Sequence, residues 1–216
     1  MRLRKHDQAA TSTICKLCSL LLLYPDEELL GVRQELLADV AELPRSAAAT
    51  ALGRFCRWWT EQDSLALQQH YVELFDLDKS CGLYLTFYAE GDKRDRGLVL
   101  LRLKRLYRAA GLPLTEGELP DFLPAMLEFA AAGPGGQGEI VLREHRAALE
   151  LLHDSLRDRD TPYQYVVDAV CLTLGDPSPA DRAHAIKLAA SGPPTEFVGL
   201  EPFGPPEIRP FTGAER

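Results

Sequence analysis

Apolar residues recur at spacings of three and four along most of the chain, a pattern that is typical of amphipathic helices. The helices expected from this spacing cover residues 11–24, 25–43, 48–59, 65–75, 97–110, 118–129, 142–156, 161–175 and 178–191, and residues 83–88 fit either a helix or a loop. No run alternates apolar and polar residues between turns, so the pattern does not support a sheet. We therefore expect an all-α, single-domain bundle of about eight or nine helices over residues 1–191, followed by a flexible Pro/Gly-rich tail over residues 192–216.

Residues 118–129 are the stretch around which we expect the bundle to be organised. Pro120 and Pro124 are spaced for a helix entrance, and either can lie in the first turn, where the backbone N–H that proline lacks would have no partner. One face of this helix is apolar and should be buried; it comprises Phe122, Leu123, Met126, Leu127, Phe129 and Ala130. The other face carries Asp121 and Glu128 two turns apart, with Ala125 and Ala132, and we expect it to form a shallow acidic strip at the surface.

The composition is ordinary for a soluble globular protein, with 46% hydrophobic and 26% charged residues. The longest apolar run, residues 20–24, is far shorter than the roughly 20 residues that cross a bilayer, and no leader-like segment follows the basic N-terminus. We therefore expect a cytoplasmic protein without direct membrane insertion. The net charge of −8 argues against a nucleic-acid partner and suits a cationic one. Five scattered cysteines argue against a disulfide scaffold.

Motifs that carry catalysis or bind metals are missing or incomplete. No nucleophile elbow, P-loop or dinucleotide-binding glycine pattern occurs, so the sequence predicts no enzyme, no catalytic residue and no bound cofactor. Cys15 and Cys18 have the spacing of half a zinc or redox site, but they lie on an amphipathic helix without a second pair, which favours ordinary buried cysteines. Residues 76–82 resemble the start of a calcium loop without its glycine and closing glutamate. His70 and Glu73 lack a third ligand, so we expect no metal site.

Two features of the later half of the chain concern structure alone. The glycines of residues 133–138 follow no strand and include no Lys-Ser or Lys-Thr pair, so we expect a flexible hinge loop there. His145 lies on the apolar stripe of the helix over residues 142–156 and is expected to be a hydrogen-bonded core histidine.

The acidic strip has two interpretations, which the residues leave open. In the first, Asp121 caps its helix, Glu128 is solvated, and Tyr71 and Phe75 belong to the core. In the second, carboxylates and neighbouring aromatic rings form a groove for a basic, amphipathic helical peptide. Apolar contacts would then supply affinity and the carboxylates would supply orientation.

Four segments resemble one known family in their order and spacing: residues 21–26, 71–75, 91–97 and 118–129. They are similar to the assembly chaperones of respiratory nitrate reductase, which are NarJ-type proteins within the wider TorD/DmsD family of redox-enzyme maturation chaperones. The resemblance spans roughly residues 12–175. A histidine is common in the family where Phe122 stands here.

The resemblance implies an all-helical protein without catalysis. Such chaperones bind the N-terminal segment of the molybdenum-containing catalytic (alpha) subunit in the cytoplasm, keep it competent for insertion of the molybdopterin guanine dinucleotide cofactor, and delay its membrane attachment. By carry-over, the candidate peptide-binding residues are Tyr71, Phe75, Glu118, Asp121 and Glu128. Arg94, Asp95 and Arg96 are candidates for a secondary polar patch, and a salt-bridge network at a helix entrance is the alternative interpretation of these three.

Two other functions compete with this one. A protein that handles nucleotide or molybdopterin cofactor and delivers it directly is the main alternative, although the sequence contains no phosphate cradle. A zinc or redox protein that uses Cys15 and Cys18 is the other.

Overall fold

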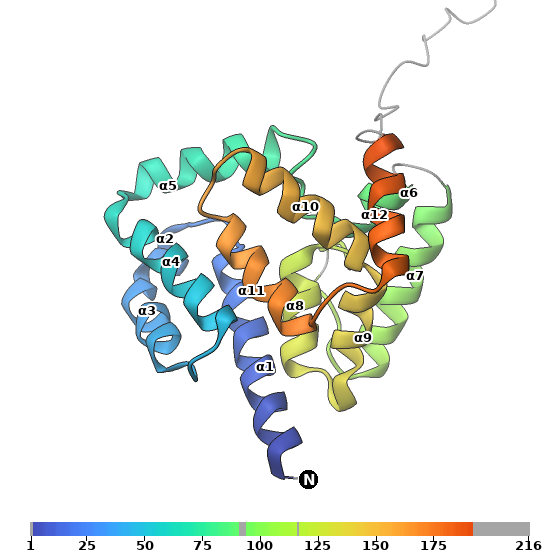
Figure 1. Ribbon diagram of the computed structural model, residues 1–216, viewed down its shortest axis with the longest axis horizontal. Helices are drawn as coiled ribbons and strands as arrows, with labels where there is room; N and C mark the ends of the chain where they lie inside the picture. Colours follow the sequence, from blue (N-terminus) through green and yellow to red (C-terminus); the bar gives the residue numbers. More distant parts are fainter. Residues whose placement is uncertain (1, 91–93, 116, 192–216) are drawn as a thin grey trace, which may run out of the picture.

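Helices make up nearly all the regular structure in the computed structural model, which describes residues 2–90, 94–115 and 117–191 (Figure 1). Within these ranges no β-strand forms, and the only β-type pairing is an isolated antiparallel bridge between Tyr84 and Phe122. The expectation of an all-α fold in one helical domain is therefore confirmed. The flexible tail predicted over residues 192–216 lies outside the described residues.

The described chain forms twelve α-helices, one π-helical segment (η1) and one 3-10 segment (η2). In chain order they are α1 (Arg2–Leu21), α2 (Glu27–Gly31), α3 (Arg33–Glu42), α4 (Ala47–Glu61), α5 (Ser64–Tyr71), η1 (Val72–Asp76), α6 (Leu85–Glu90), α7 (Arg94–Ala109), α8 (Leu123–Ala132), η2 (Pro134–Gly136), α9 (Gln137–Glu144), α10 (Arg146–Asp158), α11 (Gln164–Leu174) and α12 (Pro179–Ser191). The number exceeds the eight or nine expected because residues 85–90 are helical and two predicted helices are broken. The breaks fall at Val32 (φ −97°, ψ 13°) and His145 (φ −101°, ψ 18°), where the backbone leaves helical geometry although the apolar spacing continues.

Capping residues explain where several helices begin. Asp26 and Ser46 each accept a hydrogen bond from the backbone N–H three residues later, at 2.9 and 3.1 Å, and so satisfy a donor that the first turn leaves free. α8 begins differently, because its N-cap residue is Phe122, whose side chain makes no capping bond. Pro124 lies in the first turn of α8, as the sequence predicts.

α8 lies at the centre of the bundle and packs against α1 and α9, while α4 packs against α11 (Figure 1). Its side chains are buried almost all round: Leu123, Pro124, Ala125, Met126, Leu127, Phe129 and Ala130. The predicted exposed face of this helix is therefore wrong at Ala125 and correct at Glu128 and Ala132. Phe122, expected in the core, is only half-buried.

The glycine-rich residues 133–138 form a compact helical turn, so the prediction of a flexible hinge loop there is wrong. Gly135 (φ 62°) and Gly136 (φ 72°) adopt the left-handed conformation that glycine accepts at little cost, and α9 begins directly after them. A Cβ atom at Gly138 would lie only 2.3 Å from the Cα of Ala130. Glycine at this position therefore allows the close approach of α9 to α8.

An aromatic cluster around Tyr163 joins α4, α5 and η1 to the start of α11. The ring centres of Phe55 and Phe75 lie 5.1 and 4.9 Å from that of Tyr163. Tyr71 contacts the same ring and donates its hydroxyl proton to the Leu22 carbonyl at 3.0 Å. Tyr71 and Phe75 are only 5% and 7% exposed. The interpretation that Tyr71 and Phe75 belong to the core is therefore correct, because more than nine-tenths of each residue is buried.

Candidate functional site

Asp121, expected on a surface strip, is fully buried. Its Oδ2 atom accepts hydrogen bonds from the Thr86 hydroxyl at 2.5 Å and from the Arg96 guanidinium at 3.1 Å, while its buried Oδ1 has no hydrogen-bond partner among the described residues. The predicted exposure is wrong because α8 begins only at Leu123, so Asp121 lies in the preceding loop and not on an outer helix face. Asp121 therefore anchors this loop inside the protein and does not cap α8.

Arg96, a candidate for the secondary polar patch, is the cation of this buried pair, and its side chain is only 15% exposed. Its Nε atom donates to the Thr86 hydroxyl at 3.2 Å, and its guanidinium lies 5.6 Å from the centre of the Phe87 ring. Arg96 thus ties α7 to α6 and to the loop before α8, which fits the salt-bridge interpretation. The side chains of Arg94 and Asp95 lie outside the described part of the structure.

Further hydrogen bonds fix the same loop through its backbone. The Tyr107 hydroxyl donates to the Pro120 carbonyl at 2.8 Å, and the Leu85 amide donates to the Asp121 carbonyl at 3.0 Å. The second of these bonds belongs to the isolated bridge that pairs residues 83–85 with residues 121–123. The anchored loop holds Leu119 at the surface, where it is 37% exposed.

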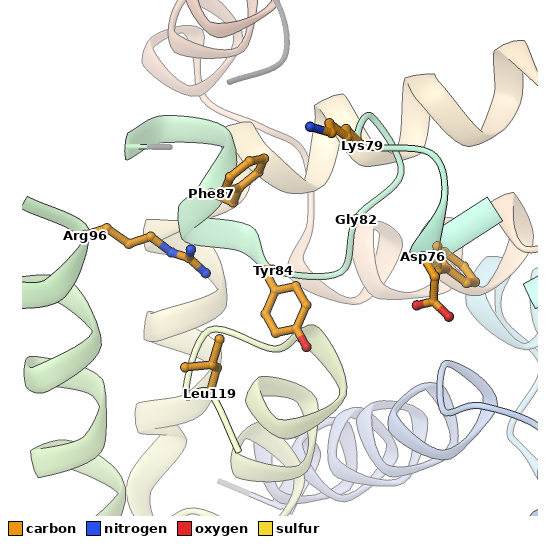
Figure 2. A pocket seen from close by; sticks show the side chains of 8 residues that line it. Asp76, Lys79, Gly82, Tyr84, Phe87, Arg96 and Leu119 are labelled. Atoms are coloured by element: carbon orange, nitrogen blue, oxygen red, sulfur yellow. The ribbon is translucent and has the colours of Figure 1, made fainter. Parts of the chain in front are cut away.

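Two adjoining pockets beside this loop form a hollow that we call the aromatic groove; their volumes are about 400 and 290 Å³. Phe75, Asp76 and Tyr84 line both pockets. Other lining residues are mostly apolar or aromatic and include Tyr24, Tyr71, Phe87, Arg96, Leu119 and Phe122. In Figure 2 Arg96 points into the larger pocket from α7, and Asp76 lies on the opposite side.

The π-helical segment η1 positions the acidic residue of the aromatic groove. The Leu77 amide donates to the Val72 carbonyl at 3.0 Å, which closes the wide turn of a π-helix, a feature that is common near functional sites. Phe75 consequently packs inward on Tyr163, whereas the next residue, Asp76, is exposed at the groove. Asp76 is the acidic side chain among the lining residues of these two pockets.

Tyr84 adds a hydrogen-bonding group to the largely apolar floor of the groove. Its ring is 40% exposed and packs on Phe122 with 5.3 Å between ring centres. Partial burial raises the pKa of Tyr84, and the carboxylates of Asp121 and Asp76 raise it further. The phenol therefore stays protonated at neutral pH and can donate a hydrogen bond to a ligand.

Glu118 and Glu128 line a separate hollow of about 260 Å³. Glu118 accepts a hydrogen bond from the Thr115 hydroxyl at 2.9 Å, and Glu128 pairs with Lys16 at 2.6 Å. The structure thus divides the five predicted peptide-binding residues. Two line the aromatic groove, two line this second hollow, and one is buried.

Cys15 and Cys18 are buried, and their burial keeps both thiols protonated. Cys15 is 1% exposed and burial raises its pKa to about 12, and burial also raises the pKa of Cys18 well above its ordinary value. Both thiols therefore stay protonated, and the prediction of ordinary buried cysteines is confirmed. Over residues 2–90, 94–115 and 117–191, no cluster of three His, Cys, Asp or Glu side chains could hold a metal ion, and no helix is long and apolar enough to cross a membrane.

The sequence model of the nitrate reductase delta subunit family matches residues 39–167, a range that contains the π-helical segment, the buried Asp121–Arg96 pair and α8. This chain belongs to that family. The resemblance in residues 71–75, 91–97 and 118–129 is thereby confirmed.

Relatives of this delta-subunit family chain differ widely in length. The chain is 38% identical over 155 residues to the nitrate reductase-like protein NarX of Mycobacterium tuberculosis, a match that covers 72% of this chain and 23% of NarX. It is 37% identical over 153 residues to the nitrate reductase molybdenum cofactor assembly chaperone NarJ of Escherichia coli, covering 69% of this chain and 64% of NarJ. NarJ of Bacillus subtilis, described as a candidate chaperone of the same kind, is 34% identical over 156 residues, covering 72% of this chain and 85% of that protein.

A solved structure from Archaeoglobus fulgidus, described as a candidate redox enzyme maturation protein, shares the fold of this delta-subunit family chain. The two superpose with a TM-score of 0.52 at 24% identity, over 82% of this chain and 93% of the other. At this level of identity the likeness concerns the fold alone.

Three groove residues of this delta-subunit family chain, Asp76, Tyr84 and Leu119, are absent from the candidates that the sequence provides. Asp76 directly follows the family motif of residues 71–75, but its exposure depends on a π-turn that apolar spacing does not reveal. Tyr84 and Leu119 come together because two loops pair through a single bridge. Among these three residues, only Asp76 could have been found from the sequence, through its position next to the motif.

Proposed function

We propose that this chain is a maturation chaperone that binds the N-terminal segment of the catalytic, molybdenum-containing subunit of nitrate reductase. It keeps that subunit competent for insertion of the molybdenum cofactor before the subunit attaches to the membrane. The relatives described as nitrate reductase molybdenum cofactor assembly chaperones support the maturation role. The aromatic groove with the exposed carboxylate of Asp76 is the observation that carries peptide binding.

The two pockets of the aromatic groove suit apolar side chains that lie on one face of a helical peptide. Burial of each methylene of such a side chain contributes about 0.8 kcal/mol. Phe75 is held in place by the ring of Tyr163, and Phe122 by the bridge to Tyr84, so the floor of the groove is formed before a peptide arrives. A preformed floor limits the entropy that binding costs.

Asp76 gives the groove a direction. A lysine or arginine of the bound segment can pair with this carboxylate while apolar side chains occupy the pockets. Because Asp76 is exposed, the pair contributes orientation and rate of association more than affinity. The net charge of −8 attracts a basic segment at longer range.

Direct delivery of the cofactor, the main alternative, receives no comparable support. A nucleotide-bearing cofactor is anionic and needs available cations and backbone donors. Arg96 and Lys79 line the larger pocket, but the charge of Arg96 is paired with Asp121, and the carboxylate of Asp76 lines the same hollow as Lys79. Peptide binding therefore fits the groove better.

Calorimetric titration with a synthetic peptide of the first residues of the catalytic subunit tests the proposal. We expect one saturable site whose affinity falls with added salt. The variant Leu119→Asp should weaken binding roughly tenfold, because it places a charge where an apolar side chain docks, and Asp76→Asn should weaken it by a few-fold. Leu65→Asp and Asp39→Asn make the same changes at exposed positions of α5 and α3 and should leave the affinity unchanged.

The second hollow provides the contrasting outcome. If Glu118→Gln and Glu128→Gln weaken the peptide while the groove variants do not, the binding site lies in that hollow. Absence of saturable binding to the unaltered protein would overturn the proposal itself.

A further inference from the structure

The outer face of α7 is basic, although the whole chain carries a net charge of −8. The sixteen residues of α7 include six cationic residues and a single acidic one, Asp95. Lys104, Arg105 and Arg108 are exposed and form no ion pair among the described residues. Figure 1 shows α7 at one edge of the molecule.

Two exposed leucines lie on the same side of α7 as these cations. Leu98 is 66% exposed and Leu101 is 45% exposed. Leu98, Leu101, Arg105 and Arg108 follow one another at helical spacings of three, four and three, so they share one face, with Lys104 beside them. We call these five residues the α7 face.

The opposite side of α7 fixes the helix to the protein. Leu103 and Tyr107 are each 1% exposed and pack into the core. Arg102 adds a contact to α9, since its guanidinium donates to both carboxylate oxygens of Glu144 at 2.9 and 2.8 Å. The α7 face is therefore present on the folded protein without any rearrangement.

We propose that the α7 face binds the surface of an anionic lipid bilayer. Charge complementarity identifies this partner, because three exposed cations and two exposed leucines share one face of the helix. A convex helix with leucines flanked by lysine and arginine suits a lipid surface, because the leucines enter the headgroup region while the long cationic side chains reach the phosphates. Leucine is also uncommon among the residues that dominate protein–protein affinity.

The acidic charge of the whole chain does not prevent this contact. At physiological ionic strength the Debye length is about 8 Å, so carboxylates farther away than this are largely screened from the lipid phosphates. The three cations of the α7 face would lie in direct contact with the headgroups and experience the full surface potential. A local basic face can therefore bind a negative surface although the net charge is negative.

Vesicle flotation with the full chain tests the proposal. We expect the protein to float with vesicles of equal parts phosphatidylcholine and phosphatidylglycerol and to stay behind with phosphatidylcholine alone. The triple variant Lys104→Glu, Arg105→Glu, Arg108→Glu should lose at least about tenfold in partition to the anionic vesicles. Leu98→Ser with Leu101→Ser should reduce partition by a few-fold.

Matched variants separate the α7 face from general charge and hydrophobicity. Arg45→Glu, Arg57→Glu and Arg182→Glu change the net charge by the same amount at exposed positions elsewhere, and Leu65→Ser with Leu172→Ser removes two other exposed leucines. These variants should float like the unaltered protein, and circular dichroism should show that all variants remain helical. The proposal is overturned if the control variants lose as much, if the protein ignores anionic vesicles, or if it binds soluble polyglutamate and not the vesicles.

Discussion

Two ion pairs tie the segment around α8 to its neighbours, and they differ in burial far more than in length. Asp121 and Arg96 approach to 3.1 Å, with side chains that are 0% and 15% exposed, whereas Glu128 and Lys16 approach to 2.6 Å and are 58% and 47% exposed. Water screens the exposed pair, so its short distance says little about its strength. The buried pair has lost its hydration, and each partner depends on the other.

The two pairs therefore have different consequences for the aromatic groove. The pair of Asp121 and Arg96 holds the loop that presents Leu119 and Phe122, so its loss should disturb the groove together with the fold. The pair of Glu128 and Lys16 joins the outer sides of α8 and α1, whose packing rests on buried apolar residues. The comparison predicts that substitutions at the first pair lower the free energy of unfolding strongly, whereas substitutions at the second pair lower it little.

The largest effect is expected from Asp121→Ala. This change leaves the guanidinium of Arg96 largely buried without its carboxylate and removes the acceptor of the Thr86 hydroxyl. We expect the free energy of unfolding to fall by about 3–5 kcal/mol, measured by urea denaturation.

Arg96→Met in the Asp121→Ala background is the matched control. Because it removes the largely buried cation that has lost the carboxylate of Asp121 and keeps an apolar side chain of similar length, the double variant should be more stable than Asp121→Ala alone. A double variant that is less stable than Asp121→Ala would contradict the role assigned to this pair.

A third pair, His153 and Asp168, is intermediate in burial, with 18% and 34% of the side chains exposed and 2.7 Å between them. The hydrogen bond to Asp168 raises the pKa of His153 above its ordinary value. The pair therefore stabilises the protein fully below the ordinary histidine pKa of about 6.5, and this contribution is lost as the pH rises through the higher folded-state pKa. His153→Gln should cost roughly 0.5–1 kcal/mol at about pH 5.5 and less at about pH 8. Urea denaturation at both pH values checks this, and a cost that grows with pH would contradict it.

The smallest effect is expected from Glu128→Gln, which removes the exposed charge and keeps the shape of the side chain. The free energy of unfolding should change by at most about 0.5 kcal/mol, because the ion pair with Lys16 is screened by water. Thermal or urea unfolding measures the change. A loss comparable to that of Asp121→Ala would show that burial does not separate the two pairs.

Most helices could be predicted from the sequence because the apolar residues that each helix buries recur at helical spacing along the chain. The stripe of Leu52, Phe55 and Trp59 in α4 is an example, and all three are at most 1% exposed. The breaks at Val32 and His145 could not be predicted, since apolar residues continue at helical spacing on both sides of each break.

The candidate site was less predictable than the fold, and Asp121 shows why. The assignment of a residue to an outer face depends on where a helix begins. The expected helix covers residues 118–129, but α8 begins at Leu123, so Asp121 lies outside the helix. A buried carboxylate also requires a distant cation, here Arg96, twenty-five positions earlier in the chain. Spacing within one helix contains no information about such a partner.

The π-turn of η1 makes the groove sensitive to chain length at one point. A π-turn accommodates one residue more than an α-turn, and relatives that lack this residue would continue α5 as a regular helix. Each residue of an α-helix turns the following side chain by about 100°. A one-residue deletion between Val72 and Phe75 would therefore rotate Asp76 away from the pockets while Tyr71 kept its place, so the length of this segment determines whether a chain offers a carboxylate to an incoming basic side chain.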